Sequence, residues 1–231
     1  MGKRTNYQKL KDFLTFPLRS LLLFYHDKWG LSSLASERYD YVSDEIIGYS
    51  LDVGCGRHNR FIKEFLNGNG KGIDIYPYEG LTEENIISDL SHFPYETTFF
   101  DSITFIANLN HIPESLRDIE LSEAYRVLKY GGNIIITMGN PLAEILAHKV
   151  ISLHDRIFGT TYDIDVERGM SEEEQYYVKD YEIIERLKRV GFEDIKKKYF
   201  WTQWGLNHLF VGWKGDCKKT STDQQVGKEG N

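Results

Sequence analysis

The sequence predicts an α/β fold built on a doubly wound, mostly parallel sheet of seven strands, preceded by an N-terminal helical extension. Two observations carry this prediction. From residue 49 onward, short apolar runs rich in β-branched residues alternate with stretches of helical periodicity. A pair of glycines follows the first run, where a sheet of this kind turns from a strand into a helix.

Each expected element follows from its local pattern. The strands are expected at 49–53, 71–76, 85–90, 101–109, 132–138, 192–201 and 207–213. The helices are expected at 60–66, 114–129, 142–155 and 180–190. Gly191 follows the last helix and is expected to cap it. These elements define a ligand-binding domain over residues 48–213, a helical extension or cap over 1–47 and a polar, disordered tail over 214–231.

The overall composition limits the classes of function that this chain can have. The 231 residues suit one domain with an appended element, and the net charge of −7 argues against a nucleic-acid partner. The chain has two cysteines, Cys55 and Cys217, without a metal-binding spacing, which indicates a reduced, cytoplasmic setting. We expect neither a secretory signal nor a membrane span, because no apolar run approaches about 20 residues.

The first 28 residues differ from the rest. They carry six lysines and arginines against two aspartates, a net charge of +4 that leaves −11 for the remainder. Pro17 lies in a segment dense in large apolar residues and is expected to open a helix. A basic, apolar helix of this kind suits peripheral contact with an anionic membrane. The alternative is a helix that caps the core or covers the active site.

The stretch "LDVGCGRHNRF", residues 51–61, raises the question of its ligand. Gly54 and Gly56 match the start of a dinucleotide fingerprint, but its last position is Asn59. Asp52 precedes the glycines, where a negative charge would disfavour a pyrophosphate. The Gly-Lys-Ser/Thr of a phosphate-binding loop does not follow. A nicotinamide-dependent oxidoreductase is therefore disfavoured, although it remains the competing enzyme class.

An acid beside the glycines suits a cationic ligand without phosphate, and S-adenosylmethionine has this chemistry. Asp74 ends the second run and is expected to accept hydrogen bonds from the ribose hydroxyls. Asp89 ends the third run and is expected to bind the adenine amino group, with the backbone N–H of Leu90 on the ring. Cys55 and Ile75, adjacent to these groups, are included among the expected cofactor contacts. Three acids at three successive strand ends make the pattern specific.

The ordered motifs resemble the class I S-adenosylmethionine-dependent methyltransferases, in the subgroup that acts on small molecules and includes quinone-biosynthesis enzymes. The matching stretches are "LDVGCG", "GIDIY", "ISDLSHFPYETTFFDSITFIANLNHIPE", "RVLKYGGNIIIT" and "LKRVGFEDIKKKYF". The resemblance covers about residues 48 to 213 and implies a Rossmann-like sheet. Two departures are His58, where many members have a third glycine, and Tyr130, where proline is usual.

The resemblance implies cofactor contacts at Asp52, Gly54, Gly56, Asp74, Asp89 and Leu90, with Asn108 as a looser match. Methyl transfer depends mainly on holding the acceptor in line with the methyl group, and a base is needed only for a weak nucleophile. His111, after the fourth strand, is the candidate base, although it could instead cap the next helix. We expect a small-molecule acceptor methylated at oxygen, with sugars, polyketides and lipid-linked intermediates all open. A methyltransferase-like binding protein without turnover is the remaining alternative.

No metal site is expected. Asp163, Asp165 and Glu167 alternate in an acidic stretch, which is typical of a solvated loop. A metal-dependent methyltransferase would place an acid just after the fourth strand, where this chain has Asn108 and His111. The signature of enzymes that methylate amino or amide nitrogens, Asn/Asp-Pro-Pro-Tyr/Phe, is also absent at that point.

Overall fold

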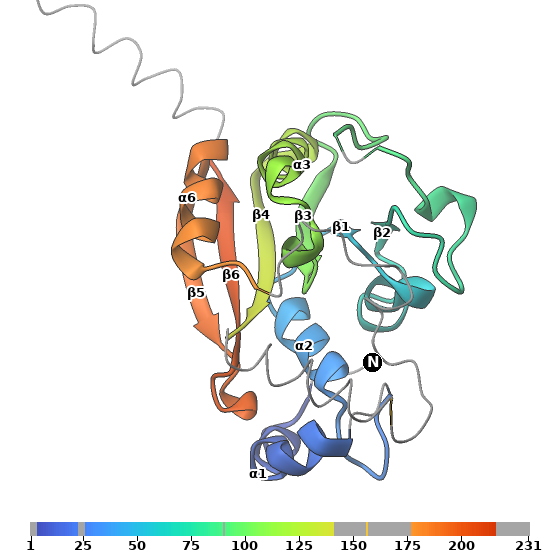
Figure 1. The fold of residues 1–231 in the computed structure, drawn as a ribbon, viewed down its shortest axis with the longest axis vertical. Coiled ribbons are helices and arrows are strands. Elements are labelled where there is room, and N and C mark those ends of the chain that lie inside the picture. Colours follow the sequence, from blue (N-terminus) through green and yellow to red (C-terminus); the bar gives the residue numbers. More distant parts are fainter. Residues whose placement is uncertain (1–3, 23–25, 90, 141–155, 157–176, 216–231) are drawn as a thin grey trace, which may run out of the picture.

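The computed structural model describes residues 4–22, 26–89, 91–140, 156 and 177–215. Within these residues a six-stranded sheet has the order β2-β1-β3-β4-β6-β5. Its strands are β1 (Ser50–Val53), β2 (Gly70–Ile73), β3 (Phe100–Ile106), β4 (Leu128–Gly139), β5 (Phe192–Tyr199) and β6 (Asn207–Lys214). The first four strands are parallel, and β6 runs antiparallel to both β4 and β5 (Figure 1).

The third expected strand, 85–90, is reduced to a single parallel bridge between Asp74 and Ile86. Asn85 is held in a tight turn, because its side-chain amide donates to the carbonyl of Gly72 at 2.8 Å and its Oδ1 accepts from the backbone N–H of Thr82 at 3.1 Å. Only the next residue, Ile86, forms a bridge, and it does so with Asp74, just after the end of β2. The described sheet therefore has six strands where the sequence predicts seven, and the bridge marks the outer edge at which the additional strand was expected.

Both faces of the sheet are covered. Along β4, Ile134 and Ile136 join one core cluster while Ile135 joins the cluster on the opposite face. The first cluster includes side chains of α3 (Glu114–Val127) and α6 (Asp180–Val190), and the second includes Val42 of α2 (Leu34–Ser43). This alternation on a strand buried on both sides is the doubly wound arrangement that the sequence predicts.

The two helices α3 and α6 confirm the periodicity over 114–127 and 180–190, whereas residues 128–129, expected to be helical, begin β4. Gly191 caps α6 with φ +115°, as expected for a residue that must adopt a left-handed conformation. The expected helix at 60–66 is a single wide turn, Phe61–Phe65. The expected helix at 142–155 and the acidic stretch with Asp163, Asp165 and Glu167 lie outside the described residues, as does the tail from residue 216.

Two helices precede the sheet, α1 (Asn6–Leu22) and α2. Pro17 lies inside α1, so the prediction that it opens a helix is wrong. Proline lacks an N–H, which leaves the carbonyl of Phe13 without its usual partner in the helix. The indole Nε1–H of Trp204 donates to that carbonyl at 3.1 Å and compensates the loss. No helix in the described ranges is long and apolar enough to cross a membrane.

Candidate cofactor and active site

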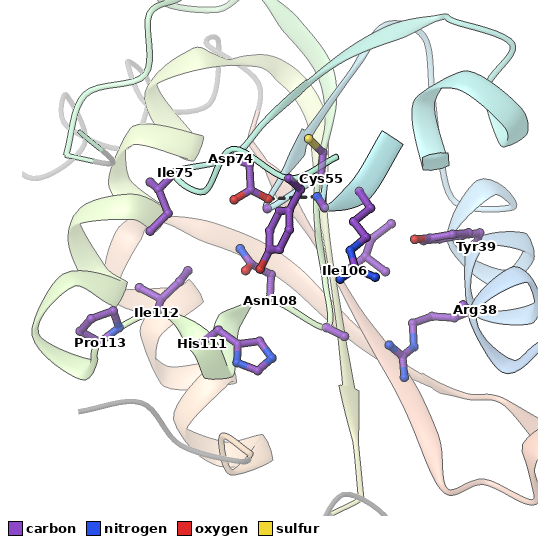
Figure 2. Close-up of a pocket in the computed structure, with 16 residues that line it drawn as sticks. Arg38, Tyr39, Cys55, Asp74, Ile75, Ile106, Asn108, His111, Ile112 and Pro113 are labelled. Carbon is purple, nitrogen blue, oxygen red and sulfur yellow. Dashed lines mark hydrogen bonds between the residues drawn. The ribbon is translucent and has the colours of Figure 1, made fainter. Parts of the chain in front are cut away.

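A cavity of about 280 Å³ lies between α2 and the segments that follow β1, β2 and β3 (Figure 2). Seven of the residues predicted for the site line it: Gly54, Cys55, Gly56, Asp74, Ile75, Asn108 and His111. The remaining lining residues are Ala35, Arg38, Tyr39, Arg57, Tyr78, Ile106, Ala107, Ile112 and Pro113. The carboxyl ends of the first three strands thus bring together groups from three separate motifs, as open α/β sheets commonly do.

The two glycines of the loop after β1 have different roles. Gly54 has φ +73°, and a Cβ at this position would lie 2.2 Å from Cγ of Asn108. The Asn108 side chain is fixed there by donating to the carbonyl of Val53 at 3.2 Å. Gly56 has φ +62°, but a Cβ at that position would meet no atom within 4 Å. Gly54 therefore permits close packing, whereas Gly56 leaves backbone open to the cavity.

Asp74 follows β2 and is nearly buried. Its Oδ2 accepts from the backbone N–H of Gly56 at 3.0 Å (Figure 2), and its Oδ1 accepts from that of Tyr76 at 3.0 Å. Both carboxylate oxygens are thereby oriented at the cavity wall. Each oxygen can accept a further hydrogen bond, so the group fits a pair of vicinal hydroxyls.

Asp52 lies beneath the loop rather than in the cavity wall. It is buried, and its Oδ1 accepts from Oγ1 of Thr104 at 2.6 Å. Burial raises the pKa of Asp52 to about 7, the Thr104 hydrogen bond opposes this shift, and the nearby charge of Asp74 adds to it. A cationic group bound near this carboxyl would favour its ionised form.

Cys55 is buried between the loop and β2. A Cβ placed on Gly72 would lie 2.7 Å from Cβ of Cys55, which shows how closely the two segments approach. Burial raises the pKa of the Cys55 thiol, so a thiolate nucleophile is disfavoured. Cys55 fills space in the cavity wall, as expected for a small packed side chain.

His58, which stands where many of these methyltransferases have a third glycine, adopts a backbone conformation that favours glycine. His58 has φ +62°, in the left-handed region, and its backbone N–H donates to the carbonyl of Glu79 at 2.8 Å. A Cβ on Gly80 would lie 2.1 Å from Nδ1 of His58, so the imidazole packs on the loop around residue 80. His58 is not among the residues that line the cavity.

Asp89 lies outside the cavity, on a second hollow that it shares with Lys71, Glu84 and His92. It is exposed, and the hydrogen bonds that it accepts from Ser91, one of them from the backbone N–H at 2.7 Å, lower its pKa. Leu90 is outside the described residues. The adenine contacts expected of Asp89 and Leu90 therefore stay predictions.

His111 ends a short 3₁₀ turn, Leu109–His111, after β3. Its backbone N–H donates to the carbonyl of Asn108 at 2.9 Å, which places its ring in the cavity wall (Figure 2). Nε2 of His111 lies 3.3 Å from Nδ2 of Asn110. An amide nitrogen can only donate, so in this arrangement Nε2 accepts and a neutral ring carries its proton on Nδ1.

Sequence reasoning missed the contribution of α2. Arg38 and Tyr39 of this helix reach toward the cavity from the side opposite Asp74 and His111 (Figure 2). Nε of Arg38 is buried and has no hydrogen-bond partner among the described residues. Arg19, Arg117 and Arg186, by comparison, each pair with a carboxylate. The packing of one helix on a distant loop leaves no local sequence pattern, so only the fold reveals these residues.

Comparison with known proteins identifies a methyltransferase domain. A family profile described as a methyltransferase domain matches residues 51–136, from β1 through the glycine loop to β4. The ubiquinone/menaquinone biosynthesis C-methyltransferase UbiE of Brucella anthropi is 27% identical over 209 residues, which cover 82% of this chain and 78% of that protein. The matched domain makes the chain an S-adenosylmethionine-dependent methyltransferase. Its cofactor is S-adenosylmethionine.

Solved structures show the same fold for this methyltransferase. A possible histamine N-methyltransferase from Thermotoga maritima superposes with a TM-score of 0.56 at 15% identity, over 90% of this chain and 99% of that one. A phosphoethanolamine methyltransferase of Haemonchus contortus, in complex with S-adenosylhomocysteine, gives a TM-score of 0.53 at 16% identity, over 93% of this chain and 60% of that one. The Rossmann-like fold is thus shared at low sequence identity.

Proposed function

We propose that this methyltransferase transfers a methyl group to an oxygen atom of a small-molecule acceptor, with His111 as the general base. One observation carries the proposal: the imidazole of His111 lines the same cavity as Gly54, Gly56 and Asp74. Its Nε2, the acceptor nitrogen in the described arrangement, can take a proton from a hydroxyl once Asn110 releases it.

The residues present fit the cofactor. Gly56 leaves loop backbone open to the cavity, and Asp74 presents two oriented carboxylate oxygens to it. We assign Asp74 to the ribose hydroxyls, the loop of Gly54 to Gly56 to the methionine portion, and Asp52 to the electrostatic support of its positive charge. S-Adenosylmethionine supplies a methyl group already activated on a sulfonium. The protein then has to align the acceptor, exclude water and remove a proton.

We further assign Arg38 to the carboxylate of the cofactor's methionine portion. A buried Nε without a partner is costly, and an arginine in a cavity wall is suited to a carboxylate. The helix α2 presents Arg38 opposite Asp74, so the two charged ends of the cavity match the two ends of the cofactor (Figure 2).

A second acceptor atom has a specific observation in its favour. The relative from Brucella anthropi is named a C-methyltransferase, so carbon methylation of a phenolic or quinol ring is the second candidate. Such a ring reacts at carbon after His111 removes its hydroxyl proton, and the proton of the methylated ring carbon is then lost to solvent to restore the aromatic ring. Sugars, polyketides and lipid-linked intermediates remain the acceptor classes considered for oxygen.

The test is a turnover screen with S-adenosylmethionine carrying a ¹³C-methyl group. Phenols, quinols, sugars and polyketides are offered in turn, and NMR of the product distinguishes an O-methyl from a C-methyl group. We expect an O-methyl product, with kcat lowered at least about a hundredfold by His111→Gln, the contribution typical of a general base. His92→Gln, an exposed histidine outside the cavity, is the matched control. A C-methyl product would replace the oxygen proposal, and full activity of His111→Gln would remove the base.

A further inference from the structure

The helix α1 is oriented with an apolar face toward solvent. Its leucine face, defined as Tyr7, Leu10, Leu14, Leu18 and Leu22, repeats at intervals of three and four residues, so these side chains share one side of the helix. All five are exposed, and Leu14 reaches 68%. A helix on the surface of a soluble domain normally presents its polar side to water. Here a row of large apolar side chains is presented instead.

The opposite side of α1 is fixed to the protein, both by packing of Phe13 and Phe16 on Trp204 and by buried polar contacts. Arg19 and Asp12 are buried, and Nη1 of Arg19 pairs with Oε2 of Glu37 on α2 at 2.9 Å. Oδ2 of Asp12 accepts from the hydroxyl of Ser32 at 2.9 Å. Rotating α1 to bury its leucines would break this buried ion pair and leave its charges unpaired, which is strongly destabilising. The outward orientation of the leucine face is thus built into the fold.

Basic and aromatic side chains lie beside this helix. Nζ of Lys11 donates to the carbonyl of Gly30 at 2.6 Å, which connects α1 to the turn that carries Lys28 and Trp29. Trp29 is 74% exposed, and Nζ of Lys28 lies 5.6 Å from the centroid of its ring. Exposed tryptophan and lysine beside an apolar face are typical of segments that lie in a membrane interface.

We propose that the leucine face of α1 binds the surface of an anionic lipid bilayer, with the leucines among the acyl chains and Lys28 and Trp29 at the headgroups. The charge distribution favours this occupant. Residues 1–28 carry +4, or +3 once the buried Arg19 is set against its partner Glu37, whereas the remainder carries −11, or −10 without Glu37. An anionic surface therefore attracts this end of the molecule and repels the rest. A symmetric pairing of two α1 helices would instead bring two positively charged segments together.

The leucine face also indicates which acceptor the enzyme methylates, an inference that rests on the proposed function. α1 is anchored to Glu37, and the next residue, Arg38, lines the cavity. Both helices lie below β3 and β4 in Figure 1, with α2 between α1 and the sheet. A bilayer bound to α1 would therefore lie one helix away from the site, which favours a lipid-like acceptor drawn from the membrane over a free sugar.

The experiment is co-sedimentation of the full chain with vesicles of phosphatidylcholine alone and of phosphatidylcholine with phosphatidylglycerol. We expect binding to the anionic vesicles that weakens as salt is raised. The variant Leu10→Gln/Leu14→Gln/Leu18→Gln changes only exposed side chains, and its binding should fall at least about tenfold. Leu116→Gln/Ile119→Gln, which alters exposed apolar residues of α3, is the matched control and should bind as the wild type does.

Three results would overturn the proposal: wild-type protein that stays in solution with both vesicles, equal binding by the leucine variant, or a dimer that the leucine variant abolishes in sedimentation velocity. The last would assign the leucine face to self-association. Calorimetry with S-adenosylmethionine on the same variants separates this surface from the catalytic site. A leucine variant that binds S-adenosylmethionine with wild-type affinity but no longer binds vesicles would confine the effect to α1. If the enzyme methylates only soluble acceptors, the proposed lipid-like acceptor is wrong, but the proposed methyl-transfer chemistry stands.

Discussion

The carboxylate of Asp74 accepts a hydrogen bond from the backbone N–H of Gly56 at 3.0 Å, which joins the end of β2 to the loop after β1. Two segments 18 residues apart are thereby held as one wall of the cavity. The same loop is fixed from below, because the backbone N–H groups of Gly54 and Cys55 donate to the carbonyl of Ile73. A rigid wall of this kind suits a cofactor that must be positioned before transfer.

Gly54→Ala is expected to weaken S-adenosylmethionine binding at least tenfold and to destabilise the protein. Two effects add: a non-glycine residue at φ +73° costs about 1 kcal/mol, and its Cβ overlaps Asn108. Gly68→Ala isolates the first effect, because Gly68 has φ +79° and open space around it. Chemical denaturation and calorimetry measure both. Equal losses of stability in the two variants would show that the Asn108 contact is unimportant.

The affinity for S-adenosylmethionine should rise with pH. The pKa of Asp52 in the free protein is raised to about 7, and a bound cation stabilises its ionised form, so binding releases a proton near neutral pH. The dissociation constant should therefore decrease between pH 6 and 8 and then level off. Calorimetry in buffers of different ionisation enthalpy detects the released proton. In Asp52→Asn this pH dependence should vanish, and its persistence would point to another group.

Glu120 allows a test of how a buried carboxyl group changes the free energy of unfolding with pH. It is buried in α3, neither carboxylate oxygen has a partner among the described residues, and burial raises its pKa to about 8. The unfolded chain releases this proton near pH 4.5, so the free energy of unfolding falls as pH rises from there to about 8. Glu120→Gln should stabilise the protein at pH 8 by about 1–3 kcal/mol and leave it nearly unchanged at pH 4.5. Destabilisation at pH 8 would mean that the carboxylate has an unrecognised partner.

Trp204→Phe should cost about 1 kcal/mol in the free energy of unfolding, because it leaves the carbonyl of Phe13 without a donor. Pro17→Ala restores a backbone N–H for that carbonyl, so the same tryptophan substitution should cost less in the Pro17→Ala background. A double-mutant cycle by urea denaturation measures the difference. Additive effects would show that the indole N–H does not compensate for the proline.

The site after β1 and β2 was predictable because strand ends and glycines leave local signals. Gly54, Gly56 and Asp74 carry those signals, and they meet in one cavity. The strand expected at 85–90 was not confirmed, since the turn held by the Asn85 side chain depends on a contact with Gly72 in another strand. The environments of Pro17 and Arg38, and which residues of the N-terminal helix face outward, could not be predicted for the same reason. The environment of Pro17 depends on Trp204, that of Arg38 on the glycine loop, and the orientation of the leucine face on Glu37. Only tertiary packing brings these partners near.

The most direct test of the account is calorimetric titration with S-adenosylmethionine and S-adenosylhomocysteine, with NAD as a control ligand. Wild type, Asp74→Ala and Asp44→Ala are compared, the last being an acid outside the cavity that ends α2. We predict that both adenosyl ligands bind the wild type and Asp44→Ala, that Asp74→Ala weakens them at least about tenfold, and that NAD does not bind. Equal affinity in Asp74→Ala, or binding of NAD alone, would contradict the assignment of this cavity to the cofactor.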